Sequence, residues 1–270
     1  MKGLFDSHCH LYVPQLVEEL DAVIRHAHDQ GVTRILVPAE DYQSSVQTLE
    51  ICSAYHEIEI FAAVGIQPQN VNAALDRNEY THIKDLISHP RVAAIGEIGL
   101  DYYWTTENTG LQKEFFKQGL DLAVACDKPV VLHNRASTDD MLLILEDWLH
   151  TIPDNKNIAR FPGVFHSFNG DLLVMDFAIQ HSFCLGLGGV ITFKNAKELQ
   201  NCIPQIPIEL LLIETDAPYL SPHPMRGKRN EPAFVRYTAE RLAELVGMDY
   251  KEIVEITTKN AERLFRIGVK

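Results

Sequence analysis

Short apolar runs alternate with longer amphipathic stretches along most of the chain. Eight of the runs are almost continuously apolar, as strands buried on both faces of a parallel sheet should be. They cover residues 4–8, 34–39, 60–66, 92–100, 130–135, 163–168, 183–189 and 210–216. The stretches between them have helical periodicity and cover residues 15–30, 42–55, 79–89, 106–126, 139–149, 171–181, 196–202 and 232–246.

Strand–helix alternation repeated eight times predicts an α/β fold, a (β/α)8 TIM barrel. Residues 249–265 predict one additional helix at the C-terminal end. No low-complexity segment, Pro/Gly-rich linker or break in composition divides the chain, so we expect residues 1–270 to form a single domain. The seventh unit is the least regular, because its helix over 196–202 is short.

The net charge restricts the classes of partner. It is −13, from 24 basic and 37 acidic side chains, so the overall field does not attract a polyanion or an anionic membrane. A nucleic-acid substrate would need a local source of positive charge. Five cysteines without a CxxC pair argue against a disulfide framework and a cysteine zinc site. With no signal peptide or membrane-length apolar run recognised, we expect a cytoplasmic protein without a membrane partner, and we favour a monomer.

Two pairs of histidines have the same HxH spacing but lie in different predicted elements. His8 and His10 follow the first strand, where residues i and i+2 point to the same face and can share one metal ion. His26 and His28 lie on the first predicted helix, where this spacing separates the side chains. The first pair can therefore chelate, and the second is interpreted as a solvated helix face.

Polar residues also mark the carboxyl ends of later strands, where barrel enzymes place their active sites. These residues are His8, His10, Glu97, His133, His166 and Asp216. A single histidine at the end of a strand is more often a hydrogen-bonded core residue than a metal ligand. Four imidazoles and two carboxylates at one end of the barrel are harder to explain as packing, and they suit two divalent ions that share a carboxylate.

Several motifs in their order along the chain resemble one family. They are DSHCHL (6–11), GEIGLDY (96–102), the HxRA of LHNRA (133–136), FHSFNG (165–170), ETDAPYL (214–220) and RGKRNEP (226–232). In these motifs the chain resembles the TatD-type metal-dependent deoxyribonucleases of the amidohydrolase superfamily, over essentially its whole length. HxH alone is weak evidence, whereas a strand-4 Glu followed by TDAP is more specific.

The resemblance implies roles for the matching positions. His8, His10, Glu97 and Asp216 would bind one divalent ion, and Glu97, His133 and His166 a second, with Glu97 bridging them. Catalysis would rest on Asp216 and Glu97, with a metal-activated water as nucleophile and Asp216 taking up its proton. The sequence leaves the ions open among Mg, Mn and Zn.

The chain departs from the family pattern at two places. GIQPQN places Gln67 and Gln69 where the family usually has histidines. An amide can donate a hydrogen bond to a phosphate oxygen but cannot transfer a proton, so we expect Gln67 to contact substrate and the substrate preference to be affected. Tyr12 stands where the family commonly has Asp, and we expect it to be a loop difference without catalytic meaning.

Two arginines are further candidates for substrate binding. Arg135 lies two residues after His133 and could contact a phosphate or form a salt bridge with a barrel carboxylate. Arg226 lies in the loop after the last strand, where such barrels often bind phosphate, although a solvated charge run would look the same.

The favoured function is two-metal hydrolysis of phosphodiester bonds, with DNA as the substrate and, by resemblance, single-stranded ends as the point of attack. One alternative is a dinuclear amidohydrolase that cleaves a C–N or ester bond of a small molecule. Many such enzymes bridge their metals with a carboxylated lysine at the end of strand 4, and this strand has no Lys. Another alternative is a barrel that binds metal or a partner without turnover; the complete ligand set argues against it.

Overall fold

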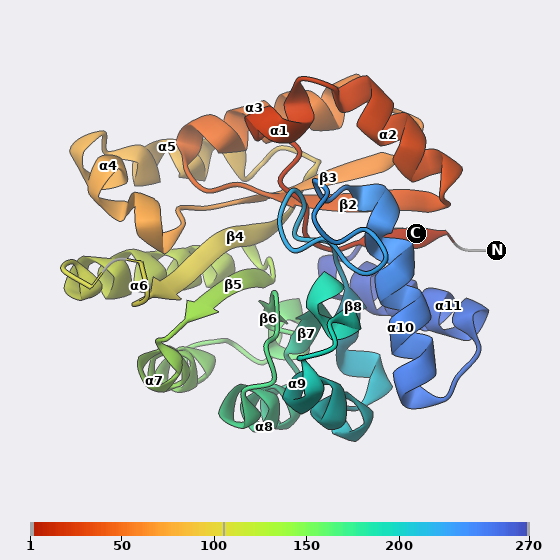
Figure 1. Ribbon diagram of the computed structural model, residues 1–270. Coiled ribbons are helices and arrows are strands. Elements are labelled where there is room, and N and C mark those ends of the chain that lie inside the picture. Colours follow the sequence, from red (N-terminus) through yellow and green to blue (C-terminus); the bar gives the residue numbers. More distant parts are fainter. Residues whose placement is uncertain (1–2, 105, 269–270) are drawn as a thin grey trace.

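Eight parallel strands form one sheet in which the spatial order is the order along the chain, β1 to β8. The computed structural model describes residues 3–104 and 106–268. Figure 1 shows the strands surrounded by helices, which confirms the (β/α)8 barrel. The strands are β1 (Leu4–Asp6), β2 (Val32–Pro38), β3 (Glu59–Val64), β4 (Val92–Asp101), β5 (Val130–Arg135), β6 (Gly163–Phe165), β7 (Cys184–Leu187) and β8 (Leu211–Ile213).

The first and last strands are joined mainly by the segments that follow them. Cys9 forms an isolated parallel bridge with Ala217. The amide of Ser7 donates to the carbonyl of Ile213 at 3.1 Å, and the amide of His10 donates to that of Ala217 at 2.9 Å. These bonds close the barrel at its carboxyl end, where the histidine pair lies.

The helices agree with the predicted order but differ from it at several ends. They are α1 (Pro14–Val17), α2 (Leu20–Asp29), α3 (Tyr42–Ala54), α4 (Val71–Asp76), α5 (Glu79–Leu86), α6 (Thr109–Cys126), α7 (Thr138–Leu149), α8 (Leu172–His181), α9 (Lys197–Cys202), α10 (Val235–Val246) and α11 (Tyr250–Phe265). Side-chain caps explain several starts: Asp41 and Asp249 form capping boxes, and the Asp171 carboxylate accepts from Leu173 and Val174.

Three differences from the predicted elements are local. The stretch 15–30 is two helices, because the backbone of Glu19, with φ −124°, interrupts it between the buried Leu16 and Leu20. The prediction also missed α4, a short helix of six residues. Finally, β1, β6 and β8 end before the polar residues assigned to them, so His8, His166 and Asp216 lie just beyond the strands, with His166 in a turn and Asp216 in a left-handed backbone conformation.

Two hydrophobic layers hold the barrel. The inner layer takes one or more side chains from each strand, and residues from the end of α11 complete it. Phe265 of α11 lies against Phe5 of β1, with ring centroids 6.0 Å apart, so this helix covers the amino end of the barrel. The outer layer, between strands and helices, is much larger. None of the helices in the two described ranges is long and apolar enough to cross a bilayer.

Candidate metal centre

Four of the predicted ligands meet at the carboxyl end of the barrel. The Nε2 atoms of His8 and His10 lie 3.2 Å apart. Asp216 Oδ1 lies 3.8 Å from His8 Nε2 and 3.5 Å from His10 Nε2. Glu97 Oε2 approaches the same two nitrogens at 3.4 and 3.9 Å. The grouping that the resemblance implied for one ion is therefore compact.

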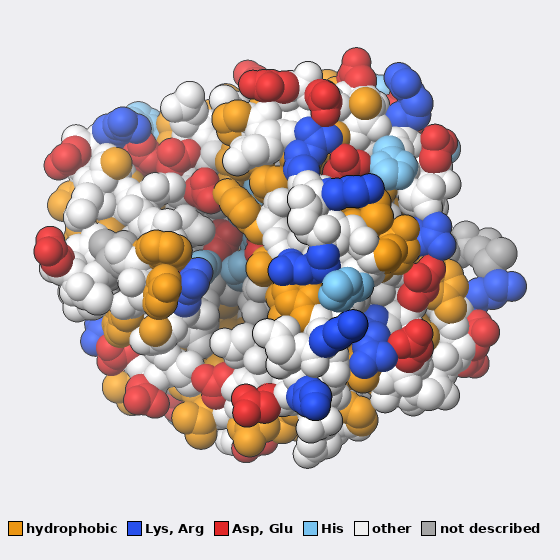
Figure 2. Space-filling model, viewed as in Figure 1, with side chains coloured by type: hydrophobic (Ala, Val, Ile, Leu, Met, Phe, Trp, Pro, Cys, Tyr) orange, Lys and Arg blue, Asp and Glu red, His pale blue; other side chains and the backbone are white. Residues whose placement is uncertain are grey.

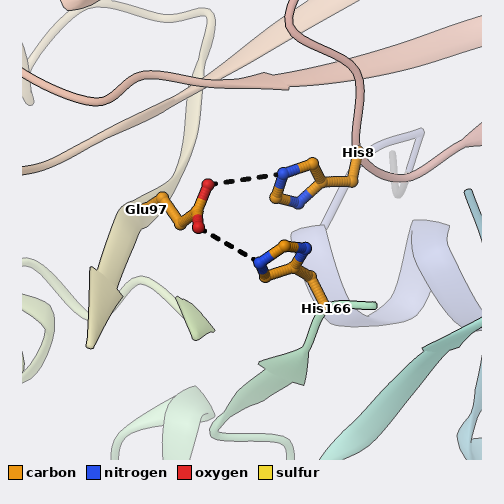
Figure 3. A group of neighbouring side chains, drawn as sticks. All are labelled: His8, Glu97 and His166. Carbon is orange, nitrogen blue, oxygen red and sulfur yellow. Dashed lines mark ion pairs between the residues drawn. The ribbon is translucent and has the colours of Figure 1, made fainter. Parts of the chain in front are cut away.

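The second implied grouping is equally compact. Glu97 Oε1 lies 2.6 Å from His133 Nδ1 and 3.1 Å from His166 Nε2, and these two nitrogens are 3.3 Å apart. Figure 3 shows Glu97 facing the neighbouring rings of His8 and His166 from one side, with one carboxylate oxygen directed at each ring. One carboxylate thus faces both groups of imidazoles.

The order of residues in β4 explains how Glu97 reaches this position. The pairing of β4 with β5 shifts register between Ile95 and Ile98, the part of the strand that contains Glu97. Gly99 then pairs with His133, and a side-chain carbon built at Gly99 would lie far inside contact distance of the His133 carbonyl oxygen. Gly99 therefore permits the close approach of two strands that carry candidate ligands.

The donor set fits divalent cations. Ligands about 2.0–2.1 Å from one tetrahedral ion stand about 3.4 Å apart, close to the separations above. Several buried polar atoms here have no hydrogen-bond partner among the described residues: His8 Nδ1, Glu97 Oε2 and His166 Nδ1. An unpartnered buried carboxylate oxygen is costly, and a cation at this position would satisfy it.

The pKa values of the histidines also favour a cation at this position. Burial lowers the pKa of His8 to about 4, so its ring is neutral and offers a lone pair. Burial also acts to lower the pKa of His10 and His133, but hydrogen bonds to Asp216 and Asp101, respectively, and the Glu97 charge outweigh it and raise each to about 9. The carboxylates thus demand positive charge, and divalent cations would supply it.

Asp216 has an unusual backbone. Its φ is +56°, in the left-handed region that residues other than glycine rarely adopt. Its amide donates to the His8 carbonyl at 2.9 Å. Such a conformation costs on the order of 1–3 kcal/mol and is concentrated at functional sites. The surrounding bonds hold Asp216 beside the histidine pair.

Two residues of the site were not identified by the sequence reasoning. The Tyr12 hydroxyl lies 3.0 Å from His10 Nδ1, so Tyr12 is more than a loop difference. Asp101 Oδ2 accepts from His133 Nε2 at 3.0 Å. The sequence could have indicated Asp101, because it lies four residues after Glu97 on the same strand, and that spacing places both carboxylates on the same face.

The two glutamines that stand where the family usually has histidines bind the carboxylates of Glu97 and Asp101. Gln67 Nε2 donates to Glu97 Oε1 at 3.4 Å, and Gln69 Nε2 donates to Asp101 Oδ2 at 3.0 Å. Gln67 is buried beside a candidate ligand, and its contact with substrate stays a prediction.

The two arginines lie on aromatic rings. The Arg135 guanidinium carbon is 4.2 Å from the ring centre of Tyr103, and no salt bridge to a barrel carboxylate is formed within the described ranges. The Arg226 guanidinium carbon is 4.0 Å from the ring centre of Phe193. A phosphate contact stays a prediction for both.

The second HxH pair lies away from the site, as expected, but only half of it is solvated. His28 is exposed, whereas His26 Nδ1 pairs with Glu231 Oε2 at 2.8 Å and its ring packs edge-on against Phe234. His26 therefore fastens α2 to the segment before α10. Cys9 is fully buried between the two ligand candidates, as predicted.

The metal centre opens on a hollow surface. Figure 2 shows a recess on this face in which acidic and histidine side chains are visible, with hydrophobic and basic side chains around it. Tyr219, from the segment after β8, is half exposed and lies edge-on to His10 with ring centres 6.2 Å apart. The β8–α10 segment therefore borders the mouth of the site.

Comparisons with known proteins agree with this geometry. The family model described as "TatD related DNase" matches residues 5–266. A Bacillus subtilis (strain 168) protein named as an uncharacterized metal-dependent hydrolase, YabD, is 41% identical over 98% of this chain and 100% of its own length. A Mycobacterium tuberculosis protein named as an uncharacterized metal-dependent hydrolase, TatD, is 34% identical over 98% of both chains.

A solved structure is similar over nearly all of the barrel. The crystal structure of YjjV, a TatD homologue from Escherichia coli K12, superposes with a TM-score of 0.88 at 28% identity, covering 97% of this chain and 98% of that one. The aligned length, the identities and the fold leave one assignment: the chain belongs to the TatD family of metal-dependent hydrolases.

Proposed function

We propose that this protein hydrolyses phosphodiester bonds of DNA with two divalent ions, and that it acts on single-stranded ends. The observation that carries the proposal is the convergence of four imidazoles on the carboxylates of Glu97 and Asp216 at the mouth of the barrel. The description of the matched family as related to DNases supports DNA as the substrate.

Each residue of the centre has a distinct task. His8, His10, Glu97 and Asp216 would hold one ion, and Glu97, His133 and His166 the other. When bound, Mg²⁺, Mn²⁺ or Zn²⁺ neutralises phosphate charge and makes water more acidic. Asp101 and Tyr12 fix the orientation of the His133 and His10 rings through the nitrogens that hydrogen-bond to them.

Asp216 is the better placed carboxylate for proton transfer. Its side chain is 13% exposed, whereas that of Glu97 is 1% exposed. A water at the mouth can therefore reach Asp216 Oδ1 and give up a proton to it, while Glu97 stays enclosed among imidazoles. Its left-handed backbone fixes the carboxylate in that position.

Local positive charge beside the mouth offsets the net charge of −13. Figure 2 shows basic side chains gathered on the part of this face built by the segments after β7 and β8. Lys194, Arg226 and Lys228 are exposed there, and within the described ranges none pairs with a carboxylate. Cations that no carboxylate neutralises are available to the phosphates of a strand.

The test is a cleavage assay with defined metals. End-labelled single-stranded and double-stranded oligonucleotides, a small phosphodiester and a small amide are each incubated with metal-free protein and with Mg²⁺, Mn²⁺ or Zn²⁺ added. We expect metal-dependent shortening of the single strand from its end and no hydrolysis of the amide.

A matched pair of variants makes the assay specific. His8→Ala should abolish cleavage, and His28→Ala, on the exposed part of α2, should leave cleavage unchanged. Hydrolysis of the amide with the phosphodiesters left intact would instead establish an amidohydrolase and refute the proposal.

A further inference from the structure

Two neighbouring aromatic side chains project from the end of β4 into solvent. Tyr103 and Trp104 are 60% and 63% exposed, and their rings stand edge to face with centres 4.9 Å apart. Tyrosine and tryptophan rings are large apolar surfaces that proteins usually cover. Their exposure at the edge of a metal centre indicates a surface for a ligand.

The backbone of this pair is fastened to the metal centre. Asp101 Oδ1 accepts from the amides of both Tyr103 and Trp104 at 2.9 Å. The other oxygen of the same carboxylate holds the ring of His133, whose Nδ1 faces Glu97. A group stacked on these rings would therefore have a fixed position relative to the ions.

A cation completes the pair. The Arg135 guanidinium carbon lies 4.2 Å from the ring centre of Tyr103 and 5.3 Å from that of Trp104. In the register of β4 and β5 the backbone of Arg135 lies opposite that of Asp101. The Arg135 carbonyl accepts from the Tyr102 amide at 2.9 Å. Within residues 3–104 and 106–268 no carboxylate binds this guanidinium, so its donors are available to an anion.

These features suit a ligand that has a flat π-face and a phosphate close together. A nucleotide of a single strand has both, and its base can stack on an aromatic ring whatever its identity. Bases inside a duplex are covered by their neighbours and cannot present a face to the protein without unstacking.

We propose that Tyr103 and Trp104 form a stacking site for an unpaired nucleobase next to the scissile phosphate, with Arg135 binding the adjoining phosphate. This inference rests on the proposed function and specifies its substrate as a strand whose bases are unpaired near the cut. The site would accept any of the bases, because every base has a π-face that can stack on an aromatic ring.

Binding is measured first, in EDTA, so that no strand is consumed. The chain has two tryptophans, and Trp148 is buried with its Nε1 bonded to the Leu120 carbonyl, so Trp104 is the one that a ligand can reach. We expect an oligothymidylate to quench the fluorescence, and an abasic strand of the same length and charge to bind about 5- to 150-fold more weakly.

Variants then assign the effect. Tyr103→Leu with Trp104→Leu keeps apolar bulk but removes the π-faces, so the preference for the base-containing strand should fall toward one in an anisotropy titration. Trp104→Phe should retain most of the preference. Leu143→Ala, at a 64% exposed position on α7, is the matched control and should change nothing.

Equal affinity of the wild-type protein for the two strands, or an unchanged preference in the double variant, would overturn the stacking site. Failure of the proposed function would look different. In that case no phosphodiester is hydrolysed with any metal, while the binding preference, which is read without metal, still decides whether bases stack on Trp104.

Discussion

The hydroxyl of Tyr12 lies 3.0 Å from Nδ1 of His10, on the side of the ring that faces away from the carboxylates. A ring whose Nδ1 is engaged in a hydrogen bond presents Nε2 to the centre in one orientation. Tyr12 is therefore a positioning residue for a candidate ligand.

Tyr12→Phe should weaken metal binding by about 10- to 100-fold, because the ring of His10 loses its partner. Isothermal titration with Mn²⁺ measures this. Tyr55→Phe removes a hydroxyl that binds Asp21 far from the site and serves as the control. Identical affinities in the two variants would mean that the Tyr12 hydrogen bond does not orient the ligand.

Glu97→Gln should lead to loss of one bound metal ion and of most of the turnover. The substitution keeps the shape of the side chain but removes the charge that faces both groups of imidazoles. Turnover should fall by about 10²- to 10³-fold or more. Elemental analysis of the purified variant gives the metal content, and two tightly bound ions with near-normal turnover would refute the bridging assignment.

Removal of the metal ions should leave the protein folded and inactive. The inner layer of the barrel is apolar and is closed by α11, so it does not depend on ions at the opposite end. The far-UV circular dichroism spectrum should survive chelation, and activity should return when the metal is restored. Loss of the helical signal in the chelator would show that the ions are structural.

Arg226→Ala should weaken binding of single-stranded oligonucleotides and reduce the slope of log affinity against log salt by about 0.7. The guanidinium rests on Phe193 and is not paired with a carboxylate in the described part of the chain. Arg25→Ala, at an exposed position on α2, is the control. An unaltered affinity and salt slope would identify the loop as a solvated turn.

Gly99→Ala should destabilise the protein by about 1–3 kcal/mol, because the added methyl group collides with the His133 carbonyl. Gly110→Ala near the start of α6 meets open space and should stabilise by about 0.4–1 kcal/mol. Urea denaturation of both variants measures the difference. Equal stabilities would mean that β4 and β5 can separate at Gly99 without cost.

The sequence predicted the barrel and the residues that meet at its mouth, because both follow from local patterns. Continuous apolar runs indicate strands covered on both faces, and the polar residues in or just after five of these runs mark the same rim. Helix ends were predictable where a side chain caps them, as at Asp41 and Asp249.

The remainder depends on contacts between distant segments. The glutamines at 67 and 69 bind carboxylates that lie 30 and 32 residues away along the chain. The position of Arg135 on two rings likewise depends on how β4 turns after Asp101. Such partners are fixed by the packed barrel and not by spacing along the chain.

The contact between Phe265 and Phe5 limits the routes by which a substrate can reach the site. Because side chains fill the interior and α11 covers the amino end, the barrel is closed at that end and open only at its carboxyl end. A long polymer therefore cannot pass through the barrel. Under the proposed function, substrate would enter and product would leave by the same opening, so a free single-stranded end would reach the centre more readily than the middle of a stiff duplex.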